Sequence, residues 1–369
     1  MSYNLSDDLS QYYTGNNELG LLNCDNSTTG NCSYTDSSDF YGVSSLGPED
    51  EERLQSIIRV VVPIFFSLIF IFGLVGNLLV VIVVGANQQM RSTTNLLILN
   101  LAIADLLFTI FCVPFTACDY MSWWPFGDTW CKIVQYMIVV TAYTSVYTLV
   151  FMSFDRYLAV VHPLTSISFR TERNAVYSII ITWLVIVVLS MPVIMIHGEF
   201  RYYYQEETRV VCVFLQNDYD NMVFHVTFFA TSYVIPLALI CGLYLRMLIR
   251  LWTGAAPGGH VSAEGRRGRK RATRMVVVVV AIFAFCWCPI QVILLVKSLK
   301  YYQTTYATVL IQILSHLLGY MNSCVNPILY AFLSDNFRKA FRKVRKSTII
   351  FFFFYVNNNN YLTVLISNK

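Results

Sequence analysis

Seven stretches of this chain are apolar over the length that a helix needs to cross a lipid bilayer, and this pattern restricts the fold more than any other feature. A spanning helix takes about 20 mostly apolar residues. The stretches cover residues 60–84, 96–115, 133–154, 175–196, 222–245, 275–296 and 306–333. Because 56% of the residues are hydrophobic and only 13% are charged, the chain cannot present a water-soluble surface. This composition excludes the classes of soluble enzymes and disordered tails for the chain as a whole.

These stretches lack the period-two alternation over about 10 residues that a transmembrane β-barrel requires. We therefore predict an all-α membrane protein, with a seven-transmembrane helix bundle over residues 57–334. Asp335 begins a segment, residues 335–346, in which Phe337 and Phe341 recur at helical spacing opposite basic residues, which predicts a short amphipathic helix on the inner membrane surface.

The placement of basic residues predicts the orientation of the bundle. Most of the 26 Lys and Arg residues lie on the side that includes residues 246–274 and 338–346. Cytoplasmic loops carry an excess of such residues, so we place the N-terminus outside the cell and the C-terminus in the cytoplasm. Acidic residues concentrate on the outer side; they could attract cationic ligands or simply keep a solvated ectodomain soluble.

The N-terminal arm, residues 1–56, is rich in Ser, Asp and Gly and is predicted to be disordered. Asn4, Asn26 and Asn31 each stand in an N-x-S/T sequence and are candidate glycosylation sites. No apolar core of a cleavable signal peptide is visible before residue 50, so we expect the first span to direct insertion.

The ten cysteines divide by compartment. Cys24, Cys32, Cys131 and Cys212 are expected on the oxidising side, with Cys118 at its border. A Cys131–Cys212 disulfide would fix the loop between spans four and five over the mouth of the bundle; a Cys24–Cys32 pair is a weaker second prediction. The rest are interpreted as small buried apolar side chains: Cys112, Cys241, Cys286, Cys288 and Cys324.

Asp105 lies in the middle of the second span, where an ionisable side chain is costly and usually functional. Asn322, Asn326 and Tyr330 recur at intervals of four, on one face of the seventh span. With Asn77 and Ser145 the two amides, Asn322 and Asn326, could surround the carboxylate. We predict a hydrated cation site, with sodium as the ion; the alternative is a structural hydrogen-bonded cluster.

Prolines interrupt the last three spans at Pro236, Pro289 and Pro327. Each removes a backbone hydrogen bond and permits a kink, which favours a bundle that moves, although such prolines are common in membrane helices. At the inner end of the third span, Asp155-Arg156-Tyr157 is a charged group whose arginine can pair locally or reach another partner, and we interpret it as a switch.

Two segments on the cytoplasmic side, residues 266–271 and 347–369, give only weak indications of function. Residues 266–271 are strongly basic, which suits contact with anionic lipid or an acidic protein but is also an ordinary topology marker. Residues 347–369 form a low-complexity cytoplasmic tail whose apolar part is too short to span a membrane. It could be a second surface anchor, but we favour an alternative coding end.

Together these residues closely resemble the rhodopsin-like, class A, G-protein-coupled receptors, and the match extends over residues 57–346. The matching elements are Gly76-Asn77, Leu101 to Asp105, Trp124-Pro125-Phe126-Gly127, Asp155-Arg156-Tyr157, Trp183, Pro236, Tyr244, Phe283, Cys286-Trp287-Cys288-Pro289 and Asn326-Pro327-Ile328-Leu329-Tyr330. Each is weak alone, but their order along the spans is highly specific.

The resemblance implies roles for these residues. Trp287 and Phe283 would relay ligand contact to a movement of the sixth helix, and Arg156, Tyr244 and Tyr330 would rearrange to admit a G protein. A sodium ion would be held by Asp105, Ser145, Asn322 and Asn326. One departure is Arg269, which stands where rhodopsin has an acidic residue that pairs with the arginine of the third span. In this chain Asp155 and Thr273 would therefore have to restrain Arg156 in the resting state. The cysteine that often follows the amphipathic helix is also absent.

The resemblance also narrows the ligand. Ile138 stands where amine receptors have a carboxylate, and the seventh span has no lysine for a retinal Schiff base. The amino-acid sequence resembles the galanin, kisspeptin and allatostatin-A receptor branch, most of all arthropod allatostatin-A receptors, in residues 94–102, 123–127, 153–163 and 322–327. The implied ligand is an extracellular amidated neuropeptide ending in Phe-Gly-Leu-amide, the implied transducer a G protein of the Gi/o class, and arrestin a further partner.

A peptide amide requires apolar depth and hydrogen-bond partners rather than a counter-charge. Gln291, Gln312 and His316 are our candidates to contact it, with Trp287 below. Tyr203 and its tyrosine neighbours would form an aromatic lip. The alternatives are satisfied polar residues of the bundle interior and ordinary interfacial aromatics.

Two other functional classes fit less well. A transporter predicts inverted repeats with matching broken helices, which seven spans with unmatched prolines do not provide. An enzyme requires a catalytic or metal-ligand cluster, and the histidines show no such spacing. We expect no nucleic-acid partner and no cofactor apart from the sodium ion.

Overall fold

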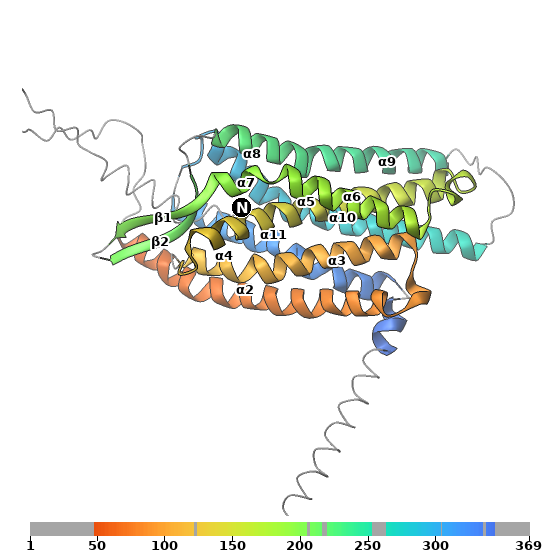
Figure 1. Ribbon diagram of the computed structural model, residues 1–369, viewed down its shortest axis with the longest axis horizontal. Coiled ribbons are helices and arrows are strands. Elements are labelled where there is room, and N and C mark those ends of the chain that lie inside the picture. Colours follow the sequence, from red (N-terminus) through yellow and green to blue (C-terminus); the bar gives the residue numbers. More distant parts are fainter. Residues whose placement is uncertain are drawn as a thin grey trace, which may run out of the picture.

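The computed structural model describes residues 48–121, 124–204, 207–215, 220–252, 263–303, 305–334 and 337–343. Within these ranges seven helical segments are long and apolar enough to cross a membrane, which confirms the predicted fold class. Figure 1 shows them side by side along the long axis, with a β-hairpin at one end. We call the hairpin end the outer end and the opposite end the inner end.

The spans are built from one or two helices each. The first is α2, Pro48–Gly85; the second joins α3, Thr93–Phe111, to α4, Val113–Tyr120; the third is α5, Gly127–Val161. The fourth joins α6, Glu172–Leu189, to α7, Pro192–Ile196. The fifth runs from α8, Asn221–Phe229, through a π-helical turn η3, Ala230–Val234, into α9, Ile235–Trp252. The sixth and seventh are α10, Ala263–Ser298, and α11, Tyr306–Leu333.

Short elements connect the spans. The 3-10 turns η1, Gln88–Met90, and η2, Thr165–Ile167, lie in the inner loops. Strands β1, His197–Tyr204, and β2, Glu207–Phe214, pair antiparallel between α7 and α8. After α11 a short helix over residues 337–343 packs Phe337 against Tyr330, with 5.5 Å between ring centroids. It lies at the inner end (Figure 1).

Helix starts follow from the local sequence. Ser92 and Thr171 accept hydrogen bonds from the backbone N–H groups of Asn95 and Asn174, at 3.3 and 3.2 Å, and so cap α3 and α6. Thr305 forms a capping box with Thr308 at the start of α11. These side chains satisfy N–H groups that a helix start leaves without a partner.

Prolines alter more spans than the sequence analysis identified. Pro289 and Pro327 lie inside α10 and α11, and the π-helical turn η3 ends two residues before Pro236. Pro114 and Pro192 also lie in the first turns of α4 and α7, where the second and fourth spans are divided. A π-turn or an internal proline interrupts the regular helix hydrogen bonding, which makes these places where a helix can bend.

The buried apolar residues form two main clusters, one in each half of the bundle. The outer cluster contains Cys131, Cys212 and Tyr320, whereas the inner cluster contains Tyr330 and Phe283. Trp287 packs against both clusters. A side chain in this position can transmit a change of packing from one half to the other.

The prediction that all five remaining cysteines are buried is wrong for two of them. Cys112, Cys286 and Cys324 are buried, but Cys241 and Cys288 are exposed on the outside of the helix bundle. On a spanning helix this surface faces lipid, and a thiol is apolar enough to lie there without a burial partner.

Candidate functional site

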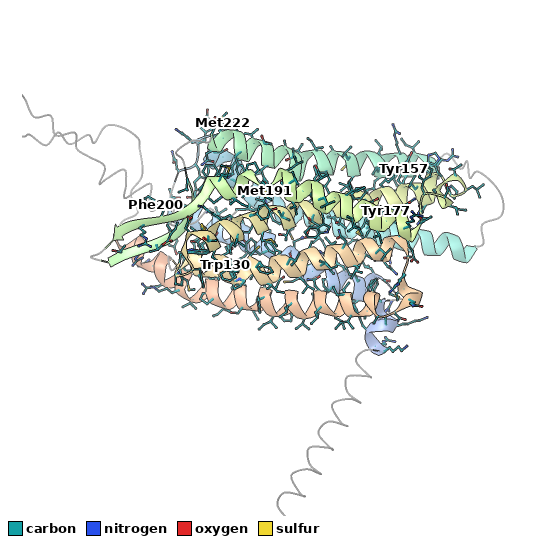
Figure 2. All side chains as sticks on the ribbon, in the orientation of Figure 1. Trp130, Tyr157, Tyr177, Met191, Phe200 and Met222 are labelled. Carbon is teal, nitrogen blue, oxygen red and sulfur yellow. A yellow bond between two sulfur atoms is a disulfide. The ribbon has the colours of Figure 1, made fainter. Side chains whose placement is uncertain are left out.

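The outer end of the bundle is covered by the β-hairpin, which is attached to two spans. The predicted disulfide between Cys131 of α5 and Cys212 of β2 is confirmed. Asp119 of α4 accepts a hydrogen bond from the backbone N–H of Cys212 at 3.0 Å, and Asp128 of α5 accepts one from the N–H of Glu199 at 3.0 Å. Figure 2 shows Phe200 of β1 and Trp130 at this end. The disulfide and these two carboxylates therefore fix the hairpin to α4 and α5.

Replacing Asp119 by alanine is expected to loosen β2 while leaving the disulfide intact. Asp119 is buried and accepts the amide of Cys212, so its removal leaves that buried N–H without its partner, at a cost of about 1–3 kcal/mol. Hydrogen exchange of the β2 amides should accelerate in Asp119→Ala and stay slow in Asp119→Asn, which keeps an acceptor oxygen. Equal exchange in Asp119→Ala and the unaltered protein would show that Asp119 does not hold β2.

Two hydrogen bonds join the second and seventh spans below the hairpin. The Tyr120 hydroxyl is bonded to Nδ1 of His316, and the hydroxyls of Thr116 and Tyr320 lie 3.1 Å apart. The His316 ring stacks on Tyr320 at 6.2 Å between centroids. Nε2 of His316 is buried and has no hydrogen-bond partner within the described ranges. One ring nitrogen is thus fixed and the other is left for a further partner.

The other predicted peptide contacts lie in the same half of the bundle as His316. Gln291 of α10 donates from Nε2 to the Ser232 hydroxyl at 3.2 Å, and Gln312 of α11 is buried. Trp287 packs against Phe283 at 6.1 Å between centroids, and its Nε1 has no partner in the part of the chain that the structure describes.

Tyr203 pairs with Thr208 through the hairpin backbone, and its side chain lies outside the described residues. The predicted aromatic lip therefore stays a prediction. The sequence analysis did not identify Tyr120, because a tyrosine at the end of an apolar span is indistinguishable from an ordinary interfacial aromatic.

Asp105 lies in the centre of the bundle and is buried. Asn326 donates from Nδ2 to Oδ2 of Asp105 at 2.8 Å, and Ser145 and Ser323 also interact with the carboxylate. Asn77 donates to the backbone carbonyls of Ser323, at 2.8 Å, and of Gly73, at 2.9 Å. The first, second, third and seventh spans therefore meet around one carboxylate.

Several residues predicted for the cation site or the switch have a buried oxygen atom with no partner in the part of the chain that the structure describes. Oδ1 of Asn322, Oδ1 of Asn77 and the Tyr330 hydroxyl are buried and have no hydrogen-bond partner among the described residues. Buried polar atoms are usually paired, so each of these atoms marks a place where water or an ion would be accommodated. Ser323 was missed by the sequence analysis, which considered only the amides on that face of α11.

At the inner end, Asp155 and Arg156 form a buried ion pair. Thr94 of α3 donates to Oδ2 of Asp155 at 2.8 Å, and Arg156 also donates to the Thr94 hydroxyl. Arg170, from the loop between the third and fourth spans, donates from Nε to Oδ1 of Asp155 at 2.8 Å. The carboxylate therefore has two arginines and a hydroxyl around it.

The remaining predicted switch residues lie around this pair. Tyr244 of α9 lies near Ser153 and Arg156, and its buried hydroxyl has no hydrogen-bond partner among the described residues. The Tyr157 ring stacks on Phe154, at 6.3 Å between centroids, and meets His162 edge-on at 5.7 Å. Figure 2 shows Tyr157 at the end opposite the hairpin. The hydrogen bonds of Arg156 go to Asp155 and Thr94, not to Thr273, which was the second predicted restraint.

Several predictions lie outside the described residues. These are the glycosylation sites Asn4, Asn26 and Asn31, the Cys24–Cys32 pair, the side chain of Arg269, and the tail from residue 347 onward. They stay predictions.

Known proteins match almost the whole described chain. The family model for the 7 transmembrane receptor (rhodopsin family) matches residues 76–330. The allatostatin-A receptor of Bombyx mori is 61% identical over 325 residues, which cover 88% of this chain and 87% of that receptor. Galanin receptor 2a of Danio rerio is 39% identical, over 77% of this chain and 78% of that receptor. Galanin receptor type 3 of Homo sapiens is 40% identical, over 78% and 79%.

These relatives are receptors, which confirms that the chain is not an enzyme, and the seven spans make it a multi-pass protein of the plasma membrane. The family match includes the Asp105 cluster, the Asp155–Arg156 pair and the hairpin disulfide. The chain belongs to the rhodopsin family of seven-transmembrane receptors.

Proposed function

We propose that this receptor is activated by allatostatin-A type neuropeptides ending in Phe-Gly-Leu-amide and signals through a G protein of the Gi/o class. The observation that carries the proposal is the 61% identity to an allatostatin-A receptor over 88% of the chain, against about 40% to galanin receptors. The alternative is a galanin- or kisspeptin-type ligand. The basic inner segments support an extracellular N-terminus.

The chemistry of the outer half suits an amidated peptide. Ile138, at the position where amine receptors carry an acid, is buried and apolar. Gln291 and His316 provide hydrogen-bonding groups without net charge. A neutral carboxamide can exchange hydrogen bonds with such groups, whereas a carboxylate would bury a charge without a counter-charge.

Activation would couple the two ends of the bundle. Trp287 packs against both apolar clusters, and Pro289 lies two residues beyond it inside α10. A peptide that displaces Trp287 would favour a bend of α10 at Pro289 and an outward movement of its inner end. The release of Arg156 from Asp155 would then admit the G protein between the inner ends of α5, α9 and α10. Tyr244 and Tyr330 would be further contacts, and α11 would bend at Pro327. Ligand and G protein would both favour the open state.

The Asp105 cluster fits a sodium ion. Hard cations prefer oxygen ligands, and the cluster supplies a carboxylate, the Ser145 hydroxyl and an unpaired amide oxygen on Asn322. Asp105, Ser145, Asn322 and Asn326 would hold the ion, which would supply a positive charge to a buried carboxylate. These side chains come from three different spans, so any movement of α11 relative to α3 would change the affinity for the ion.

Replacing Asp105 by asparagine is expected to abolish the effect of sodium on agonist affinity. In the unaltered receptor, replacing potassium by sodium should lower peptide affinity by about fivefold or more, which is the usual scale of allosteric coupling. Asp105→Asn removes the charge that attracts the ion, so its affinity should be the same in both salts. Glu172→Gln, an exposed carboxylate-to-amide change at the start of α6, is the matched control. Retained sodium dependence in Asp105→Asn would support the structural interpretation of the cluster.

Replacing Gln291 or His316 by alanine is expected to remove the preference for amidated over free-acid peptide. A site that hydrogen-bonds one group strongly rejects an analogue lacking it, so we expect the unaltered receptor to prefer the amide by about a hundredfold or more. Competition binding with both peptide forms measures the ratio. Gln303→Ala, an exposed glutamine in the loop before α11, should keep it. An equal loss of affinity for both forms would indicate a folding role instead.

The function is tested by measuring cyclic AMP in cells that express the full chain. A Phe-Gly-Leu-amide peptide, galanin and kisspeptin are compared, with and without pertussis toxin. We expect suppression by the first peptide alone, abolished by the toxin. Suppression by galanin or kisspeptin instead would select the alternative ligand, and toxin-resistant signalling would contradict Gi/o coupling.

A further inference from the structure

Arg170 is placed against the inner switch by the loop between the third and fourth spans. The loop turns through η2, and the backbone N–H of Arg170 donates to the carbonyl of Ser166 at 2.8 Å. Thr171 then caps α6, so Arg170 lies between a turn and a helix start. Its Nε reaches Oδ1 of Asp155 at 2.8 Å. The side chain of Arg170 is 28% exposed and that of Asp155 is 3% exposed.

Asp155 therefore uses different oxygens for its two arginines. Arg170 donates to Oδ1, whereas Arg156 and Thr94 donate to Oδ2. The two guanidinium groups do not compete for one atom, so the release of Arg156 leaves the bond from Arg170 in place. Both arginines carry a positive charge close to the same carboxylate, so each reduces the attraction that the other feels.

The effect of Arg170 on the switch follows from these contacts. When Arg156 leaves, a buried carboxylate without any cation would be strongly unfavourable. With Arg170 still bonded to Oδ1, the carboxylate keeps a counter-charge. The presence of Arg170 therefore lowers the free energy of the open state relative to the resting state.

We infer that Arg170 is a positioning residue that acts through Asp155 to ease the release of Arg156, rather than a second part of the restraint. The inference rests on the proposed coupling to a G protein. The two roles predict opposite changes in activity. If Arg170 eases the release of Arg156, its loss makes the receptor less active, although an ion pair of the resting state has been removed; if Arg170 were part of the restraint, its loss would make the receptor more active.

The test compares Arg170→Gln with Arg173→Gln in the full chain. Arg173 is exposed, lies three residues further on, and contacts Tyr177 at 5.3 Å from the ring centroid, so its replacement makes the same charge change without touching Asp155. Figure 2 shows Tyr177 at the same end as Tyr157. Binding of a non-hydrolysable GTP analogue is measured in membranes that contain Gi/o, with and without the Phe-Gly-Leu-amide peptide, at matched surface expression.

We expect Arg170→Gln to lower basal nucleotide binding and to raise the peptide concentration for half-maximal response by about three- to tenfold, within the range of single-residue effects on coupling. Arg173→Gln should leave both unchanged, and Arg170→Lys, which keeps the charge, should restore part of the response. In an Asp155→Asn background, which raises basal activity by itself, Arg170→Gln should cause no loss, because the carboxylate through which it acts is gone. A rise in basal binding, an equal effect of Arg173→Gln, or the same loss from Arg170→Gln in the Asp155→Asn background as in the unaltered receptor would each overturn the inference.

A distance measurement tests the same point without a G protein. Spin labels at the exposed positions Val176 of α6 and Val277 of α10, with Cys241 and Cys288 replaced by serine, report the separation of the two inner ends. Arg170→Gln should reduce the population with the longer separation, and an increase would contradict the inference. If the unaltered receptor activates no Gi/o, the proposed coupling fails, while this measurement still decides the role of Arg170.

Discussion

Breaking the Cys131–Cys212 disulfide is expected to reduce peptide affinity by about a hundredfold or more, which corresponds to about 2.7 kcal/mol. The bond joins residues 81 apart in sequence, and closing a loop of that length stabilises a fold by about 4–5 kcal/mol in the chain-entropy account. Without it, the hairpin over the bundle mouth keeps the hydrogen bonds in which Asp119 and Asp128 accept the backbone N–H groups of Cys212 and Glu199. Peptide binding would then also have to order the hairpin.

Saturation binding to Cys212→Ser at matched surface expression measures this loss. The double variant Cys131→Ser/Cys212→Ser should bind no worse than the single variant, because both lack the same bond. Cys118→Ser, a free cysteine near the same end, should bind as the unaltered receptor does. Unchanged affinity in Cys212→Ser would mean that the two carboxylates suffice to hold the hairpin.

Replacing Asp155 by asparagine is expected to raise signalling in the absence of ligand by about tenfold. The carboxylate pairs with Arg156 in the resting state, and the neutral amide loses that attraction while it still offers an oxygen to Thr94. A loss of about 1.4 kcal/mol from the resting state changes the ratio of the two states tenfold.

Basal nucleotide exchange in membranes measures the change, and Glu172→Gln serves as the control for loss of one carboxylate at the same end. Basal activity in Asp155→Asn at or below that of the unaltered receptor would contradict a restraining role for the pair. Asp155→Asn and Arg170→Gln thus act on one ion-pair cluster but are expected to shift activity in opposite directions.

The bundle could be predicted from the sequence because a bilayer leaves few choices. A membrane-spanning segment must satisfy its own backbone hydrogen bonds, so each of the seven apolar stretches had to be a helix. The disulfide followed from the side of the membrane on which Cys131 and Cys212 lie. Asp105 was identifiable because a charged side chain inside a span is costly.

The polar partners were harder to predict, because they depend on how helices face each other. Ser323 is adjacent to the predicted Asn322 but offers its carbonyl to Asn77. Tyr120 reaches His316 across two spans that lie far apart in sequence. The contact of Arg170 with Asp155 depends on a loop turn, and a lone arginine in a basic loop otherwise only indicates topology.

The most direct test of the proposed ligand is competition binding of a labelled Phe-Gly-Leu-amide peptide to membranes that contain the full chain. We expect saturable binding that the unlabelled amidated peptide displaces and that its free acid, galanin and kisspeptin displace only at about a hundredfold higher concentration or more. Absence of saturable binding to receptor present at the cell surface, or equal displacement by galanin, would contradict the proposed ligand.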